Sequence, residues 1–177
     1  MLSLLIWVLV IIYMLGWENK LKNIDDVCVI VQARLSSQRC PRKMVKPFAG
    51  TTLTDICLEK LSASNVIPKE NIILSVYEPE LKDIGKKHGI TIFDRSKKSA
   101  FWDGGEGSHI KDMYEWWDKV PFKYTVFVNA CAPMMRTKTI DNFFTSYVNS
   151  KSDGMFAVLP KKNYFWNSDG SIITPQK

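Results

Sequence analysis

The chain has 177 residues, enough for one domain with its own hydrophobic core and too few for two domains of ordinary size. Its hydrophobic content of 46% and charged content of 24% exclude a disordered chain as the default expectation. The net charge of +6 favours anionic partners such as phosphate groups, nucleic acid or a lipid surface, without choosing among them.

The N-terminal segment 1–17 carries no charged side chain. Roughly 20 apolar residues span a bilayer, whereas a signal peptide needs a basic start and a cleavage site of small residues. The first charged residues, Glu18, Lys20 and Lys22, follow this segment, so the positive-inside rule leaves the rest of the chain in the cytoplasm. The sequence favours a cytoplasmic domain that residues 1–17 anchor to the inner face of a membrane. The alternatives are an apolar extension packed on the domain and a start codon assigned too early.

A polar link at 18–26 leads into the folded domain, which is expected over 27–177. Residues 27–32, VCVIVQ, are almost all apolar, which is typical of a strand covered on both faces in a parallel sheet. A long loop with two prolines follows at 33–50. Residues 51–64 have helical spacing, with Thr52 or Thr54 as the expected cap.

The rest of the domain repeats this alternation of strands and helices. Further short apolar strands are expected at 71–76, 91–93, 124–129 and 154–159. Further helices are expected at 79–88, 110–120 and 137–150, and a polar, glycine-rich surface loop at 96–108. Gly89 would end the first of these helices, Thr137 or Thr139 would cap the last, and Trp116 and Trp117 would lie in the core. The alternation predicts an α/β fold, a three-layer α/β/α sandwich with a mainly parallel sheet.

The loop after the first strand concentrates positive charge. It carries no acid and five cations, namely Arg34, Arg39, Arg42, Lys43 and Lys46. Ligands of open α/β sheets bind at the carboxyl ends of the strands, and arginine and lysine are the usual phosphate ligands. The loop therefore predicts a phosphate site, with a solvated basic loop as the alternative. No GxxxxGK[ST] or strand-linked GxGxxG motif is present, and no nucleic-acid-binding motif accompanies the charge, so nucleic acid is not an expected partner.

The stretch VQARLSSQRCPRKMVKPFAGTTLTDICLEKL resembles the opening of the acylneuraminate (CMP-sialic acid) cytidylyltransferases and their spore-coat-polysaccharide relatives. The family pattern is Ala-Arg-x-x-Ser-x-x-x-Pro-x-Lys, and it is matched by Ala33, Arg34, Ser37, Pro41 and Lys43. FDRSKKSAFWDGGEGSH is similar to the family's arginine-containing loop, and VFVNACAPMMRTKTIDNFF to its LNPTSPLLRPETID stretch. The resemblance covers 27–177 and implies the nucleotide-diphospho-sugar transferase (GT-A-like) fold.

This resemblance implies transfer of CMP from CTP to a hydroxyl of a nonulosonate-like sugar acid, with release of pyrophosphate, for activated-sugar and surface-glycan biosynthesis. Arg34 and Lys43 would hold the triphosphate. The other residues expected to contact nucleotide or sugar are Ala33, Ser37, Arg39, Arg95, Ser108 and Asn129. Among them, Arg95 and Ser108 would lie near the cytosine and ribose, and Asn129 near the base or the sugar.

Several departures from the family pattern leave alternatives open. Cys131 and Ala132 replace the usual threonine and serine on the sugar side. Family members continue further, to an acidic pair that binds Mg²⁺. This chain looks truncated before that pair and contains no Asp-x-Asp. The resemblance therefore implies Mg²⁺, but the sequence offers no ligands for it. One alternative is a truncated or regulatory nucleotide-binding module without catalysis. Another is a membrane-anchored glycosyltransferase of similar fold, against which the missing Asp-x-Asp counts. Residues 164–166, YFW, would border the pocket or belong to a segment that forms a homodimer.

Overall fold

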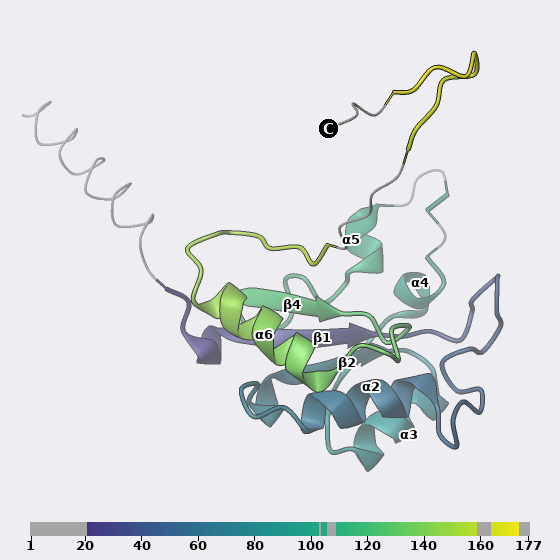
Figure 1. Cartoon of the computed structure of the whole chain (residues 1–177). Coiled ribbons are helices and arrows are strands. Elements are labelled where there is room, and N and C mark those ends of the chain that lie inside the picture. Colours follow the sequence, from purple (N-terminus) through teal and green to yellow (C-terminus); the bar gives the residue numbers. More distant parts are fainter. Residues whose placement is uncertain (1–20, 103, 106–108, 159–163, 174–177) are drawn as a thin grey trace, which may run out of the picture.

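A computed structural model describes residues 21–102, 104–105, 109–158 and 164–173 of the chain (Figure 1). The expected membrane anchor at 1–17 and the expected site residue Ser108 lie outside these ranges. Within the described ranges, no helix has the length and apolar character needed to cross a membrane.

A four-stranded parallel sheet forms the centre of the domain. Its strands are β1 (Val27–Gln32), β2 (Ile72–Val76), β3 (Thr91–Asp94) and β4 (Tyr124–Val128), in the spatial order β3-β2-β1-β4. The central strand β1 pairs in parallel with β2 on one side and β4 on the other. Its first five residues are buried, as expected for a strand covered on both faces. These four strands confirm the predicted parallel sheet.

The two faces of the sheet are covered unequally (Figure 1). On one face, α2 (Leu53–Ser62), α3 (Pro79–Lys87) and α6 (Thr137–Val148) form the larger core with alternate residues of β1. The opposite face carries a small cluster around Ile30 and Trp116, beneath α5 (Ile110–Met113) and the turns that follow it. The short elements are η1 (Ile24–Asp26), η2 (Lys69–Asn71) and α4 (Lys97–Ala100). The predicted α/β/α sandwich is thus confirmed, with one thin outer layer.

The helix ends were predicted with mixed success. Thr52 caps α2 as expected, because its hydroxyl accepts the Asp55 N–H at 3.1 Å. Gly89, at φ +64°, follows α3 as expected. The prediction that Thr137 or Thr139 caps α6 is wrong, because the N-cap position is Arg136 and no side chain caps it. The Thr137 hydroxyl instead donates to the Lys60 carbonyl of α2, at 3.2 Å.

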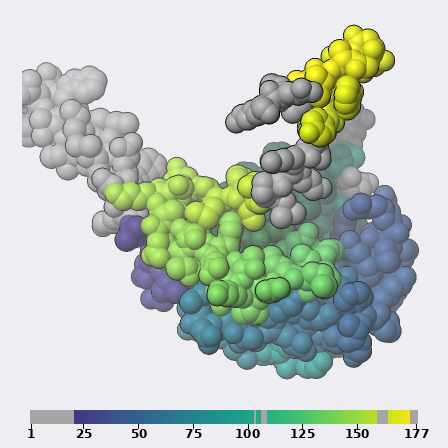
Figure 2. All heavy atoms as spheres, in the orientation of Figure 1, coloured from purple at the N-terminus to yellow at the C-terminus, as the bar shows by residue number. Residues whose placement is uncertain are grey.

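Three further predictions need correction. The helix expected at 110–120 stops at Met113, and the chain continues in turns that bury Trp116 but leave Trp117 70% exposed. The loop expected at 96–108 contains α4, capped by Ser96. Residues 154–158 form no strand and are mostly exposed, so the described sheet ends at β4. The chain then ends its described part in a short antiparallel turn bridged by Trp166 and Ile172, which stands clear of the domain (Figures 1 and 2).

Candidate functional site

The basic loop, residues 33–50, leaves the carboxyl end of β1 and folds back on itself. The Leu35 carbonyl accepts the Arg42 N–H at 3.0 Å, and Arg42 adopts a left-handed conformation with φ +58°. At the far end of the loop, the buried Thr54 hydroxyl donates to the Met44 carbonyl at 2.8 Å, and Met44 lies in the core. Backbone and core contacts therefore hold the shape of the loop.

Arg34 joins the basic loop to the segment that follows α4. Its Nη1 donates to the Trp102 carbonyl at 2.6 Å and to the Ala100 carbonyl at 3.4 Å. The Ser36 hydroxyl also approaches the Ala100 carbonyl, at 3.4 Å. Among the described residues, no carboxylate forms an ion pair with Arg34, which is half-buried. Within the described part of the chain, the guanidinium is thus bound by neutral carbonyls, and no described carboxylate competes with an anion for it.

Arg95 lies just beyond β3 and is almost completely buried, with 3% exposure. Its Nη2 donates to the Ser99 carbonyl at 2.6 Å and its Nε to the Ser99 hydroxyl at 3.0 Å, and further bonds reach the carbonyls of Ala33 and Met113. Burial, with a smaller contribution from the nearby Arg34, lowers its pKa from 12.5 to about 10, against the opposing effects of Glu78 and Glu115. Arg95 remains charged at neutral pH and ties the ends of β1 and β3 to α4 and α5. The nucleotide contact expected for it stays a prediction.

The remaining expected residues are spread along the same edge of the sheet. Ala33 donates its N–H to the Ser75 carbonyl of β2 at 3.2 Å and accepts from Arg95. In the basic loop, Ser37 and Lys43 are half-buried and Arg39 is exposed. The hydrogen bonds therefore bring Ala33, Arg34 and Arg95 together, around the carboxyl ends of β1 and β3.

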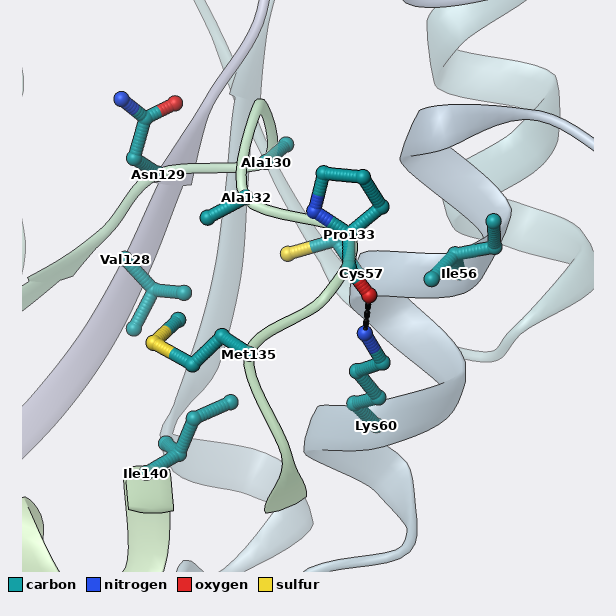
Figure 3. A pocket seen from close by; sticks show the side chains of 10 residues that line it. All are labelled: Ile56, Cys57, Lys60, Val128, Asn129, Ala130, Ala132, Pro133, Met135 and Ile140. Carbon is teal, nitrogen blue, oxygen red and sulfur yellow. Dashed lines mark hydrogen bonds between the residues drawn. The ribbon is translucent and has the colours of Figure 1, made fainter. Parts of the chain in front are cut away.

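Asn129 lies apart, at the carboxyl end of β4, where its Oδ1 accepts the Cys131 N–H at 2.9 Å. Figure 3 shows its amide pointing away from the Cys57 and Lys60 side of the adjacent pocket. This pocket has mostly apolar walls, and the Lys60 ammonium is held by the Pro133 carbonyl. Burial raises the pKa of the Cys57 thiol to about 12, so this thiol stays neutral. The pocket has none of the free charge that a phosphate site requires.

Two polar residues near the site had not been predicted from the sequence. Gln32, the last residue of β1, accepts the Trp116 indole N–H at 2.8 Å. Glu78, which precedes α3, accepts the Leu35 N–H at 2.8 Å, and its second oxygen is buried without a hydrogen-bond partner among the described residues. The Ser75 hydroxyl, on neighbouring β2, is also buried and unpartnered within the described part of the chain. A polar residue at the end of an apolar strand would have been the signal for Gln32.

The described residues do not fit a protein-made magnesium site. Across 21–102, 104–105, 109–158 and 164–173, no three histidine, cysteine, aspartate or glutamate side chains gather to hold a metal ion. Mg²⁺ prefers carboxylate and phosphate oxygens in an octahedral arrangement.

The fold and the basic loop together define a parallel α/β domain with a cationic loop at the carboxyl end of its central strand. The model of the cytidylyltransferase family matches residues 28–169, so the chain belongs to this family. The spore coat polysaccharide biosynthesis protein SpsF of Bacillus subtilis (strain 168) is 31% identical over 68 residues, which are 37% of this chain and 28% of SpsF. Family membership confirms the resemblance at the level of cytidylyltransferases and favours that hypothesis over a glycosyltransferase.

Solved structures support the fold. A cytidylyltransferase from Leptospira borgpetersenii serovar Hardjo-bovis (strain JB197) has a TM-score of 0.55 and 24% identity, covering 70% of this chain and 49% of that protein. A CMP:2-keto-3-deoxy-manno-octonic acid synthetase, solved in complex with CTP, has a TM-score of 0.54 and 15% identity, covering 68% of this chain and 46% of that protein. The chain thus spans less than half the length of SpsF and of each of these two structures.

Proposed function

We propose that this chain binds CTP through the basic loop and takes part in transferring CMP to a hydroxyl of a nonulosonate-like sugar acid. The observation that carries the proposal is Arg34, a half-buried cation at the carboxyl end of β1 that has no acid partner among the described residues. It lies inside the region that matches the cytidylyltransferase family. The names of two similar proteins, a spore coat polysaccharide biosynthesis protein and a synthetase that joins CMP to a sugar acid, support surface-glycan biosynthesis as the setting.

The proposed reaction is attack of the sugar hydroxyl oxygen on the α-phosphorus of CTP. A new oxygen–phosphorus bond forms, the bond to the β-phosphate oxygen breaks, pyrophosphate leaves, and the hydroxyl proton passes to solvent or a base. Catalysis of such a step consists mainly of positioning and of stabilising phosphate charge. Arg34 and Lys43 would hold the triphosphate, with Ser37, Arg39 and the Ala33 backbone nearby. To do so, Arg34 would exchange the carbonyl of Trp102 for phosphate oxygens.

The roles of the other expected residues belong to the same proposal. Arg95 and Ser108 are assigned to the cytosine and ribose, and Asn129 to the base or the sugar, by resemblance to the acylneuraminate cytidylyltransferases. Mg²⁺ is proposed to arrive as its complex with CTP, since substrate phosphates are usual ligands of this ion. The exposed Cys131 stands on the expected sugar side, where it changes the polarity of the acceptor site relative to the family pattern.

The first test is a calorimetric titration of the full chain with CTP and with ATP in the presence of Mg²⁺. We expect CTP to bind more tightly than ATP. A folded protein that binds neither nucleotide, or that prefers ATP, contradicts the proposal. The second test measures pyrophosphate release with CTP and a panel of sugar acids.

One alternative has a specific observation in its favour, a nucleotide-binding module without catalysis. The described residues contain no cluster of acids for a metal ion. This alternative expects CTP binding as above but no pyrophosphate release with any sugar acid. Membrane attachment through residues 1–17 and a homodimer also remain predictions, to be tested by co-sedimentation with vesicles and by light scattering.

A further inference from the structure

Glu78 connects the start of α3 to the basic loop. Its Oε1 accepts the backbone N–H of Leu35 at 2.8 Å, a contact between residues 43 positions apart in the sequence. Leu35 directly follows Arg34, the loop cation that bonds to the carbonyls of Ala100 and Trp102. The carboxylate therefore fixes the main chain immediately beside this guanidinium.

The Glu78 side chain is used for this contact and not for its own helix. Glu78 occupies the N-cap position of α3, yet its side chain accepts no hydrogen bond from the first turn of that helix. Glutamate is a poor N-cap, whereas aspartate, one methylene shorter, is among the best. The longer side chain reaches Leu35 instead, so its length serves the loop.

Among the described residues, no ion pair neutralises the negative charge of Glu78. Its Oε2 is buried and has no hydrogen-bond partner within the described part of the chain. Glu78 is near enough to Arg95 to raise the pKa of that buried guanidinium, against the larger lowering caused by burial. A carboxylate in this place repels an incoming phosphate, so charge attraction to the ligand does not explain it.

We propose that Glu78 is a positioning residue for the triphosphate, which holds the basic loop through the Leu35 N–H so that Arg34 faces the ligand. The inference rests on the proposed function only in taking the anion of the loop to be a triphosphate. What the loop needs from residue 78 is an acceptor oxygen at the right distance, and the charge itself opposes binding.

Two substitutions separate distance from charge. Glu78→Gln keeps the length and the acceptor oxygen and removes the charge. Glu78→Asp keeps the charge and shortens the side chain, so that it no longer reaches Leu35. The matched control is Asp83→Asn, which changes an exposed acid of the same helix that pairs with Lys86. All variants are made in the full chain, and thermal unfolding confirms that each is folded.

The probe is inorganic tripolyphosphate, which carries the phosphate chain without a base, followed by CTP. We expect Glu78→Asp to raise the dissociation constant for both about tenfold, the size of effect that one hydrogen bond to a charged group can have. Glu78→Gln should bind as tightly as the wild type or more tightly, and Asp83→Asn should be unchanged. Glu78→Asp should leave the unfolding midpoint within a few degrees of the wild type, because a new cap on α3 offsets part of the lost bond to Leu35. Weaker binding by a variant that stays fully folded, with no such loss in Glu78→Gln, distinguishes positioning from a general structural role.

Wild-type affinity in Glu78→Asp, or equal losses in the aspartate and glutamine variants, would overturn the inference. The outcome also separates this inference from the proposed function. If tripolyphosphate shows the expected pattern but CTP is not preferred over ATP, the role of Glu78 stands and the proposed function fails. If the wild type binds neither tripolyphosphate nor CTP, both are overturned.

Discussion

Replacing Arg34 with alanine tests the basic loop at its central cation. In the free protein Arg34 bonds to two neutral carbonyls, those of Ala100 and Trp102. A hydrogen bond that involves a charged group contributes about 1.5–3 kcal/mol, with the lower end for a neutral partner such as a carbonyl and the upper end for a charged partner such as phosphate. The wild type breaks its hydrogen bonds to the carbonyls when it binds a phosphate. Only the difference in free energy between the two kinds of hydrogen bond, about 1.5 kcal/mol, therefore favours binding of the ligand. The substitution should therefore raise the dissociation constant for CTP about tenfold.

The measurement is a calorimetric titration of the wild type and the variant with CTP and Mg²⁺. Arg42→Ala is the matched control, since it removes the same charge from the same loop. Arg42 forms an ion pair with Glu80 in which both side chains are about half exposed, so this loss should change the affinity little. Equal losses in the two variants would show that the loop acts only through its net charge. An unchanged affinity in Arg34→Ala would remove Arg34 from the site altogether.

Two further predictions concern Lys43 and Asp55. Lys43→Ala should weaken CTP binding more than Lys46→Ala, because Lys43 is half-buried, Lys46 is exposed, and charges interact more strongly away from water. A larger loss of affinity in Lys46→Ala, measured in paired titrations, would contradict this prediction. Burial raises the pKa of Asp55, but hydrogen bonds with Lys87 and His88 outweigh it and lower the pKa from 3.8 to about 2. Because this folded-state pKa is depressed, the ionised group contributes about 2 kcal/mol above pH 4, lost as the pH falls towards 2. Urea unfolding across this range should show that loss in the wild type and not in Asp55→Asn, and parallel curves would refute it.

The parts of the fold that were predicted correctly depend on local patterns. The first strand, β1, has the bounds that its apolar run indicated, because burial on both faces requires an apolar side chain at nearly every position. The run at 154–158 is equally apolar in type, yet it forms no strand. A strand needs a neighbour, and pairing partners are set by the whole sheet and not by the run itself. Trp116 and Trp117 differ for a similar reason, since one turn residue faces the sheet and the next faces water.

In the candidate site, too, features that depend on neighbouring residues in the sequence could be predicted, and features that depend on distant residues could not. The cations of the basic loop are close together in the sequence, so their clustering could be recognised before the structure was known. Glu78 could not, because its contact with Leu35 joins residues 43 positions apart. Arg95 shows a further limit. The sequence places an arginine after β3, but a guanidinium that binds phosphate and one that binds backbone carbonyls use the same residue type. Only the buried bonds to Ser99, Ala33 and Met113 reveal what it does in the free protein.

The partners of the charged groups explain how the loop tolerates its cations. Arg34 and the Glu78 carboxylate lie at the same end of the sheet, because both are near enough to Arg95 to change its pKa. An ion pair between them would satisfy both charges, but it would also remove Arg34 from any ligand. Instead, Glu78 bonds to the loop backbone and Arg34 to neutral carbonyls, which are weaker competitors than a carboxylate. The charge of Arg34 is thereby held in place without being neutralised by any described carboxylate. This is the arrangement expected where the compensating anion comes from solution, and the proposed triphosphate would supply that charge.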